Sequence, residues 1–103
     1  MSTHWTFFTN YGHVLFIVAK CPEITLREMA QEIGITERAV QRIISDLEAD
    51  GFLKITKIGR HNSYKVVGRK HLKHSIEKSC RVDEIVDLIN NRCIADGGCG
   101  CTN

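Results

Sequence analysis

Residues 25–67 read TLREMAQEIGITERAVQRIISDLEADGFLKITKIGRHNSYKVV, and this stretch decides the fold. Its first part predicts a short helix, a glycine turn and a second helix. Its last part, FLKITKIGRHNSYKVV, predicts two strands joined by a basic tip. A helix-turn-helix followed by a basic hairpin is the element order of a winged helix. The expected fold class is therefore mainly α with a small β-hairpin (α+β), a winged helix-turn-helix with a C-terminal amphipathic helix.

Both helices of this stretch have clear end signals. Thr25 stands before an apolar-periodic run and Glu28 follows three residues later, which is the spacing of a capping box. Gly34 is expected to end the first helix, Thr36 to cap the second and Gly51 to close it. The apolar residues recur at helical spacing in both helices: Leu26, Met29, Ala30 and Ile33 in the first, and Val40, Ile43, Ile44 and Leu47 in the second. Each helix can therefore bury one face.

The opposite face of the second helix is polar and suited to DNA. At about 100° per residue, its side chains fall away from the apolar stripe. Arginine can contact guanine, glutamine adenine, serine either base, and all three can contact phosphates. An isolated helix of this kind would usually be only a solvated face, but the capped helix before it and the hairpin after it favour DNA contact. The predicted contacts are Thr36, Glu37, Arg38, Gln41, Arg42 and Ser45, with Thr25 and Arg27 from the first helix. For Glu37, a favourable interaction with the helix dipole is preferred over contact with a cytosine amine.

The hairpin supplies a second set of candidate contacts. The connecting tip is expected to span Gly59 to Ser63, and it can lie along the DNA backbone or send Arg60 into a narrow minor groove. A solvated turn is the alternative, since glycine and asparagine are common in turns of any function. The predicted contacts are Lys57, Arg60, His61, Asn62, Ser63 and Lys65.

The net charge differs strongly between segments of the chain. The whole chain has 14 basic and 12 acidic residues, a net of +2. Residues 51–81 contain nine Lys or Arg and one Glu, a net of +8, whereas residues 1–50 and 82–103 each carry −3. Positive charge concentrated on the hairpin and the segment after it is what phosphate binding requires.

The segments WTFFTNYGHVLFIVAK, REMAQEIGITERAVQRIISDLEADGFL and GRHNSYKV resemble small prokaryotic winged helix-turn-helix transcriptional regulators of the broad MarR/ArsR kind. The resemblance covers roughly residues 5–90 and implies a homodimer that places two recognition helices in successive major grooves. It matches Thr36, Arg38, Gln41, Arg42 and Ser45 to the family's reading helix and Arg60 to its wing tip. The chain lacks the long flanking dimerisation helices of larger MarR members and the Cys-x-Cys pair that metal-sensing ArsR members carry before the recognition helix. Inducer binding and metal sensing are therefore not implied.

The flanking segments complete the domain plan. Trp5, Phe7 and Phe8 precede a helix expected from about Asn10 to Lys20, and these aromatics are expected to pack in the core rather than to form a ligand box. The apolar stripe Val82, Ile85, Val86 and Ile89 predicts a C-terminal helix that packs on its own domain or, preferably, pairs with a second copy. The expected division is a winged helix-turn-helix DNA-binding domain over 1–68, a basic connector and dimerisation helix over 69–92, and a flexible Gly/Cys tail over 93–103.

Five cysteines raise the question of a metal. Cys93, Cys99 and Cys101 lie in RCIADGGCGCTN and can chelate zinc or another soft metal, with His71, His74 or Cys80 as a fourth ligand. Their spacing matches no established zinc motif, so free thiols in a tail are the favoured interpretation and no cofactor is expected to be required. Metal binding and redox sensing stay open as ways to regulate DNA affinity.

Catalysis is not expected. The chain contains no phosphate-binding glycine loop, nucleophile elbow or HExxH motif. No apolar run reaches membrane-spanning length and no secretory signal is evident, so a cytoplasmic location is expected. The sequence thus predicts a sequence-specific regulator of transcription that binds double-stranded DNA, with repression favoured. The alternatives are a metal- or thiol-responsive DNA-binding switch and a winged-helix module that binds another protein. The small-molecule effector, if any, is not indicated.

Overall fold

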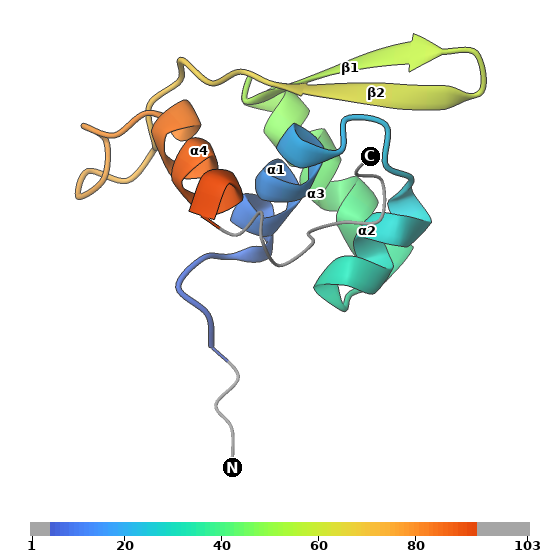
Figure 1. The fold of residues 1–103 in the computed structure, drawn as a ribbon, viewed down its shortest axis with the longest axis horizontal. Helices are drawn as coiled ribbons and strands as arrows, with labels where there is room; N and C mark the ends of the chain where they lie inside the picture. The colour runs from blue at the N-terminus through green and yellow to red at the C-terminus, as the bar shows by residue number, and fades with distance from the viewer. Residues whose placement is uncertain (1–4, 93–103) are drawn as a thin grey trace.

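The computed structural model describes residues 5–92. Its elements are α1 (Asn10–Lys20), α2 (Leu26–Ile33), α3 (Glu37–Ala49), β1 (Leu53–Ile58), β2 (His61–Val66) and α4 (Val82–Arg92). The hairpin of β1 and β2 projects beyond the helices, and α4 lies beside α1, away from the hairpin tip (Figure 1). This arrangement confirms the predicted α+β winged helix-turn-helix. None of the helices within residues 5–92 is long and apolar enough to cross a bilayer.

The helix ends form as their sequence signals predicted. The backbone N–H of Glu28 donates to the Thr25 hydroxyl at 3.1 Å, and the Glu28 carboxylate accepts from the Thr25 N–H at 3.0 Å, so both halves of the capping box are present. Gly34 ends α2 in the left-handed conformation, with φ of 88°. Because a side chain is strained at that φ, glycine fits the turn that separates α2 from α3.

Helix α1 lies at the centre of the core. Val14 and Val18 are fully buried, and α1 contacts α2, α3, α4 and β2. The apolar stripes of α2 and α3 close the core around it, with Met29 and Val40 at 0 % exposure. The buried face of each helix is thus the face that its hydrophobic spacing indicated.

The hairpin is antiparallel, and its tip is shorter than predicted. Ile58 pairs with His61, so only Gly59 and Arg60 connect the strands. The expected tip from Gly59 to Ser63 is therefore wrong for residues 61–63, which belong to β2. Gly59 supplies the positive φ, 61°, that a two-residue hairpin loop needs at its first position. The loop between α1 and α2 supports β2, since the Tyr64 N–H donates to the Pro22 carbonyl at 2.8 Å.

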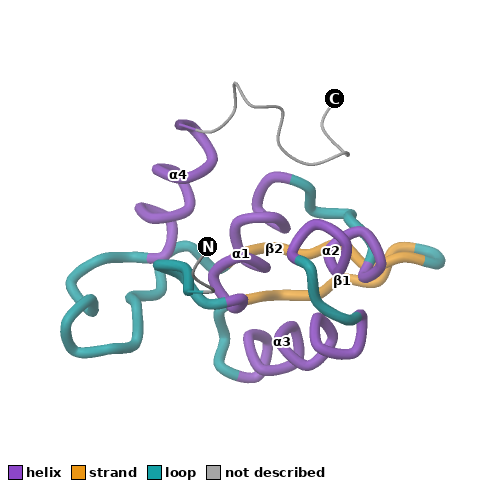
Figure 2. Tube along the Cα trace, turned by 90° about the horizontal axis from the view of Figure 1, so that it is seen from below, coloured by secondary structure: helices purple, strands orange, loops and turns teal. Residues whose placement is uncertain are grey.

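Helix α4 packs on its own protomer. Val82 and Val86 are buried, and the Asn90 side-chain amide donates to the Phe16 carbonyl at 3.4 Å. The loop over residues 67–81 makes a wide excursion next to α4 (Figure 2), and it returns where the Asp83 N–H donates to the Gly68 carbonyl at 3.0 Å. Much of the apolar stripe of α4 is thus covered within one chain, and Leu88 is the large apolar side chain of this helix that stays exposed, at 53 %.

The N-terminal aromatic side chains do not enter the core as expected. Phe7 is 89 % exposed and Trp5 is 64 % exposed; the two rings pack edge to face at 5.0 Å between centroids. Phe8 is 37 % exposed and packs edge to face on Phe16 at 5.2 Å. The expectation of core packing is therefore wrong for Trp5 and Phe7. The buried core begins with Val14 of α1, and the segment before this helix lies on the surface.

Candidate nucleic-acid interface

The outward face of α3 is open to solvent. Arg38, Gln41 and Arg42 are exposed, and so are Glu37 and Ser45. Burial of these side chains inside the protomer would have excluded DNA contact, and they are not buried. The opposite face of α3 carries the buried residues Val40, Ile43, Ile44 and Leu47. The helix therefore divides into a core face and a polar face, as its periodicity indicated.

The two cap residues have a structural role. The Thr36 hydroxyl accepts from the Ala39 N–H at 3.0 Å, just as the Thr25 hydroxyl accepts from Glu28 at the start of α2. Both hydroxyls therefore fix the first turn of a helix. Arg27 is exposed on α2 beside the cap. The first-turn carboxylate of Glu37 lies where the positive end of the helix dipole favours it.

A groove runs along the N-terminal half of α3. Thr36, Arg38, Gln41 and Arg42 line it, and Asn10 joins them from the first turn of α1. Asn10 was not among the predicted contacts. The spacing of α1 alone gives no sign that its first residue lies against the polar face of α3, because that proximity depends on how the two helices cross. The groove brings four of the predicted residues together with one that sequence reasoning missed.

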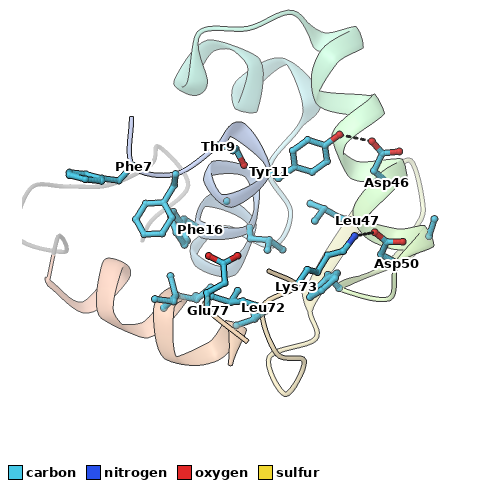
Figure 3. Close-up of a pocket in the computed structure, with 18 residues that line it drawn as sticks. Phe7, Thr9, Tyr11, Phe16, Asp46, Leu47, Asp50, Leu72, Lys73 and Glu77 are labelled. Atoms are coloured by element: carbon cyan, nitrogen blue, oxygen red, sulfur yellow. Dashed lines mark hydrogen bonds and ion pairs between the residues drawn. The ribbon is translucent and has the colours of Figure 1, made fainter. Parts of the chain in front are cut away.

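The C-terminal half of α3 has the opposite charge. Asp46 accepts a hydrogen bond from the Tyr11 hydroxyl at 2.5 Å, and Asp50 pairs with Lys73 at 2.9 Å (Figure 3). The hydrogen bond to Asp46 raises the pKa of Tyr11, and the ammonium of Lys73 lowers the pKa of Asp50. These carboxylates are engaged within the protomer and would repel phosphates. The N-terminal half is therefore the part of α3 suited to a DNA groove.

The hairpin carries cations that no acid neutralises within the described chain. The ion pairs of residues 5–92 are Lys73–Asp50 and Arg81–Asp83, and neither involves the hairpin. Lys57, Arg60, His61 and Lys65 are exposed, and Asn62 and Ser63 are half-buried.

The strand register shows a further basic residue. Lys54 lies directly opposite Lys65 across the two strands, on one face, whereas Lys57 pairs with Asn62 on the other face. Like charges at directly opposed positions destabilise a hairpin, so the Lys54–Lys65 pair is costly in the free protein and favours an anionic partner. Lys54 was missed because the sequence pattern does not give the register. Lys57 and Lys65, which were grouped in the prediction, lie on opposite faces.

The metal site predicted at Cys93, Cys99 and Cys101 lies outside the described residues, as does the tail over 93–103. Within residues 5–92, no three His, Cys, Asp or Glu side chains are grouped so as to hold a metal ion. Of the proposed fourth ligands, His71 Nδ1 lies 2.7 Å from the Lys78 carbonyl oxygen, and His74 Nδ1 accepts from the Ile76 N–H at 3.1 Å. Burial raises the pKa of the third, Cys80, which disfavours the thiolate that metals bind.

Comparison with known proteins gives a match that covers the first three helices. No curated protein matches the chain. Residues 12–54 match the family model described as winged helix-turn-helix DNA-binding. The match covers most of α1, all of α2 and α3 and the start of β1, and it ends before the hairpin tip. It does not distinguish a MarR or ArsR subfamily. Residues 12–54 are thus similar in sequence to winged helix-turn-helix DNA-binding domains. The fold and the exposed polar face of α3 agree with this similarity.

Proposed function

We propose that the chain is a sequence-specific repressor that binds double-stranded DNA as a homodimer. In this proposal the N-terminal half of α3 enters the major groove, and the hairpin lies on the phosphate backbone or in the adjoining minor groove. The observation that carries the proposal is the exposed set Arg38, Gln41 and Arg42 on the second helix of the matched motif, where neither arginine forms an ion pair among residues 5–92. These side chains have the donors and acceptors that read guanine and adenine edges.

The charge on the hairpin supports a backbone-binding role. Between Gly51 and Ile76 the chain has seven Lys or Arg and no Asp or Glu. Arg60 is half of a two-residue tip on a hairpin that projects past the helical body (Figure 1). A narrow projection with a terminal guanidinium suits insertion into a minor groove, where the negative potential is strongest when the groove is narrow.

Repression and dimerisation rest on further arguments. A small DNA-binding domain can act by blocking access of the transcription machinery, which makes repression the simplest action. A two-fold dimer doubles the basic surface and matches a palindromic site. Because α4 is largely covered by α1, pairing through α4 would use Leu88 and the neighbouring exposed residues. Sedimentation velocity of the wild type and of Leu88→Glu tests this: a dimer that dissociates in the variant supports pairing through α4, and a monomeric wild type contradicts it.

The function is tested by selecting bound duplexes from a random pool and then measuring affinity against salt. We expect an enriched sequence, and a fall in log affinity with log salt of about 0.9 per phosphate contacted. Affinity for a scrambled duplex should be lower at every salt concentration. No enrichment together with a flat salt response would contradict the proposal and favour a protein partner for this face.

A further inference from the structure

A cavity of about 640 Å³ lies at the C-terminal half of α3, beyond the DNA-suited groove of its N-terminal half. It is open to solvent on one side and is lined by the segment before α1, α1 itself, the end of α3, the loop over 67–81 and α4 (Figure 3). Its floor is apolar and consists of buried side chains: Leu15, Leu47, Phe52, Val82 and Val86. Small-molecule sites in proteins are usually apolar clefts of about 300–1,000 Å³ with a few polar groups. The cavity has this size and this floor.

The rim of the cavity is aromatic. Phe7, Phe8, Tyr11 and Phe16 line it, and the first three are at least 37 % exposed. A monomer rarely leaves several aromatic side chains together at the surface without a binding role. The faces of aromatic rings carry partial negative charge and attract cations.

The charged groups of the cavity also favour a cation. Its lining contains Asp46, Asp50 and Glu77 against Lys73, a net of −2 beside a segment that is strongly basic. Lys73 neutralises Asp50 at 2.9 Å, whereas Tyr11 donates a hydrogen bond to Asp46 and leaves its negative charge in place. Glu77 lines the same cavity and has no ion pair among the described residues (Figure 3). Two carboxylates therefore line the cavity together with the aromatic rim, and neither forms an ion pair among the described residues.

The protein already contains one cation–π contact at this cavity. The ammonium of Lys70 lies 4.8 Å from the centroid of Phe52, a ring that forms part of the cavity floor. This distance is within the range of a cation–π contact. An anionic molecule would face Asp46 and Glu77 while Lys73 is already paired with Asp50, and an uncharged molecule would leave both carboxylates unpaired.

We propose that this cavity binds a small aromatic organic cation. Its rings pack among Phe8, Tyr11 and Phe16, and its positive charge faces Asp46 and Glu77. Asp46 belongs to α3, so the ligand contacts the helix that carries the DNA-suited groove. The proposal goes beyond DNA binding, and its test contains no DNA.

The test is a titration of the full chain with tetraphenylphosphonium, followed by isothermal calorimetry and by the fluorescence of Trp5. Trp5 is the only tryptophan of the chain, and its ring lies 5.0 Å from that of Phe7 on the cavity rim. Tetraphenylborate is the matched control, because it has nearly the same shape and the opposite charge. We expect the phosphonium to bind at least tenfold more tightly than the borate. Equal or tighter binding of the borate would overturn the proposal.

Two carboxylate variants locate the site. Asp46→Asn and Glu77→Gln should each weaken phosphonium binding at least threefold, whereas Glu32→Gln, an exposed acid on α2 outside the cavity, should leave it unchanged. Glu77 is exposed on a loop, so its amide variant tests the site even if Asp46→Asn disturbs α3. Binding by the double variant Asp46→Asn/Glu77→Gln within twofold of wild type would overturn the proposal. Because no duplex is present, failure of DNA binding would leave this result unaffected, and failure here would leave the DNA-binding proposal standing.

Discussion

The two halves of α3 use their polar residues in different ways. In the N-terminal half, Arg38, Gln41 and Arg42 are exposed, and neither arginine has an ion pair within the described chain. In the C-terminal half, Asp46 and Asp50 are held by a tyrosine hydroxyl and a lysine ammonium of the same protomer. The polar side chains of the N-terminal half are therefore free to contact another molecule, whereas the two carboxylates of the C-terminal half already interact with side chains of the same protomer. The difference indicates which residues of α3 are available for contact with DNA and which are engaged by neighbouring side chains.

The first prediction concerns the N-terminal half. Arg38→Ala and Gln41→Ala should each reduce discrimination between the selected duplex and a scrambled one by about 1–3 kcal/mol, because base contacts are lost. Competition binding with both duplexes measures this loss. Glu48→Gln, an exposed change in the C-terminal half, is the control and should leave sequence preference unchanged. Equal losses for both duplexes in the arginine and glutamine variants would mean that this half does not read bases.

The second prediction concerns the close approach of Gly68, after the hairpin, to Asp83 of α4. A Cβ at Gly68 would lie 2.7 Å from the Cβ of Asp83, so Gly68→Ala must push α4 away from the end of the hairpin. We expect a loss of about 1–3 kcal/mol in the free energy of unfolding, as for other overpacked sites. Urea denaturation measures it, with the exposed neighbour change Arg69→Ala as the control. A stability equal to that of wild type would contradict the close approach of Gly68 and α4.

The third prediction separates the hairpin from α3. Lys57→Ala and Lys65→Ala should weaken binding to all duplexes alike, and each should reduce the salt slope by about 0.9 if one phosphate contact is lost. Because the two lysines lie on opposite faces of the hairpin, unequal losses would identify the face that meets DNA. Lys54→Ala should follow Lys65→Ala, its cross-strand neighbour. A loss confined to the selected duplex would contradict a backbone role for these lysines.

The smallest expected effect is on the acid dependence of stability. Lys73 lowers the pKa of Asp50 below its ordinary value of 3.8, so the ionised pair stabilises the fold above that pH. As the pH falls below 3.8, the unfolded chain takes up the proton first and this contribution is lost. Asp50→Asn should therefore make the urea midpoint less sensitive to a change from about pH 5 to about pH 3. The pair is exposed and screened by solvent, so the change will be small. An unaltered pH dependence would show that the pair contributes nothing.

Local sequence signals predicted most of the fold. The capping box at Thr25 and Glu28, the glycine at 34 and the spacing of apolar residues act within one or two helical turns, so they can be recognised without tertiary information. The outward direction of Arg38 and Gln41 followed from the same periodicity. For these elements, local preference and tertiary packing agree.

The missed features depend on contacts between distant segments. The place of Asn10 beside α3, the pairing of Lys54 with Lys65 and the shortened hairpin tip arise from helix crossing and strand register. The exposure of Trp5 and Phe7 depends on how completely α1 fills the core. The cavity joins residues from four separate segments, and hydrophobic spacing along any one of them does not indicate it.

The most direct test of the account follows the arginine side chains themselves. Nitrogen-15 NMR resolves the guanidinium Nε–H groups of Arg38, Arg42, Arg60 and Arg81 during titration with the selected duplex. The account predicts large shifts for the first three and none for Arg81, whose Nε–H donates to Asp83 in the first turn of α4 at 3.0 Å. Shifts at Arg81 with unchanged signals from Arg38 and Arg42 would contradict the claim that the N-terminal half of α3 reads DNA.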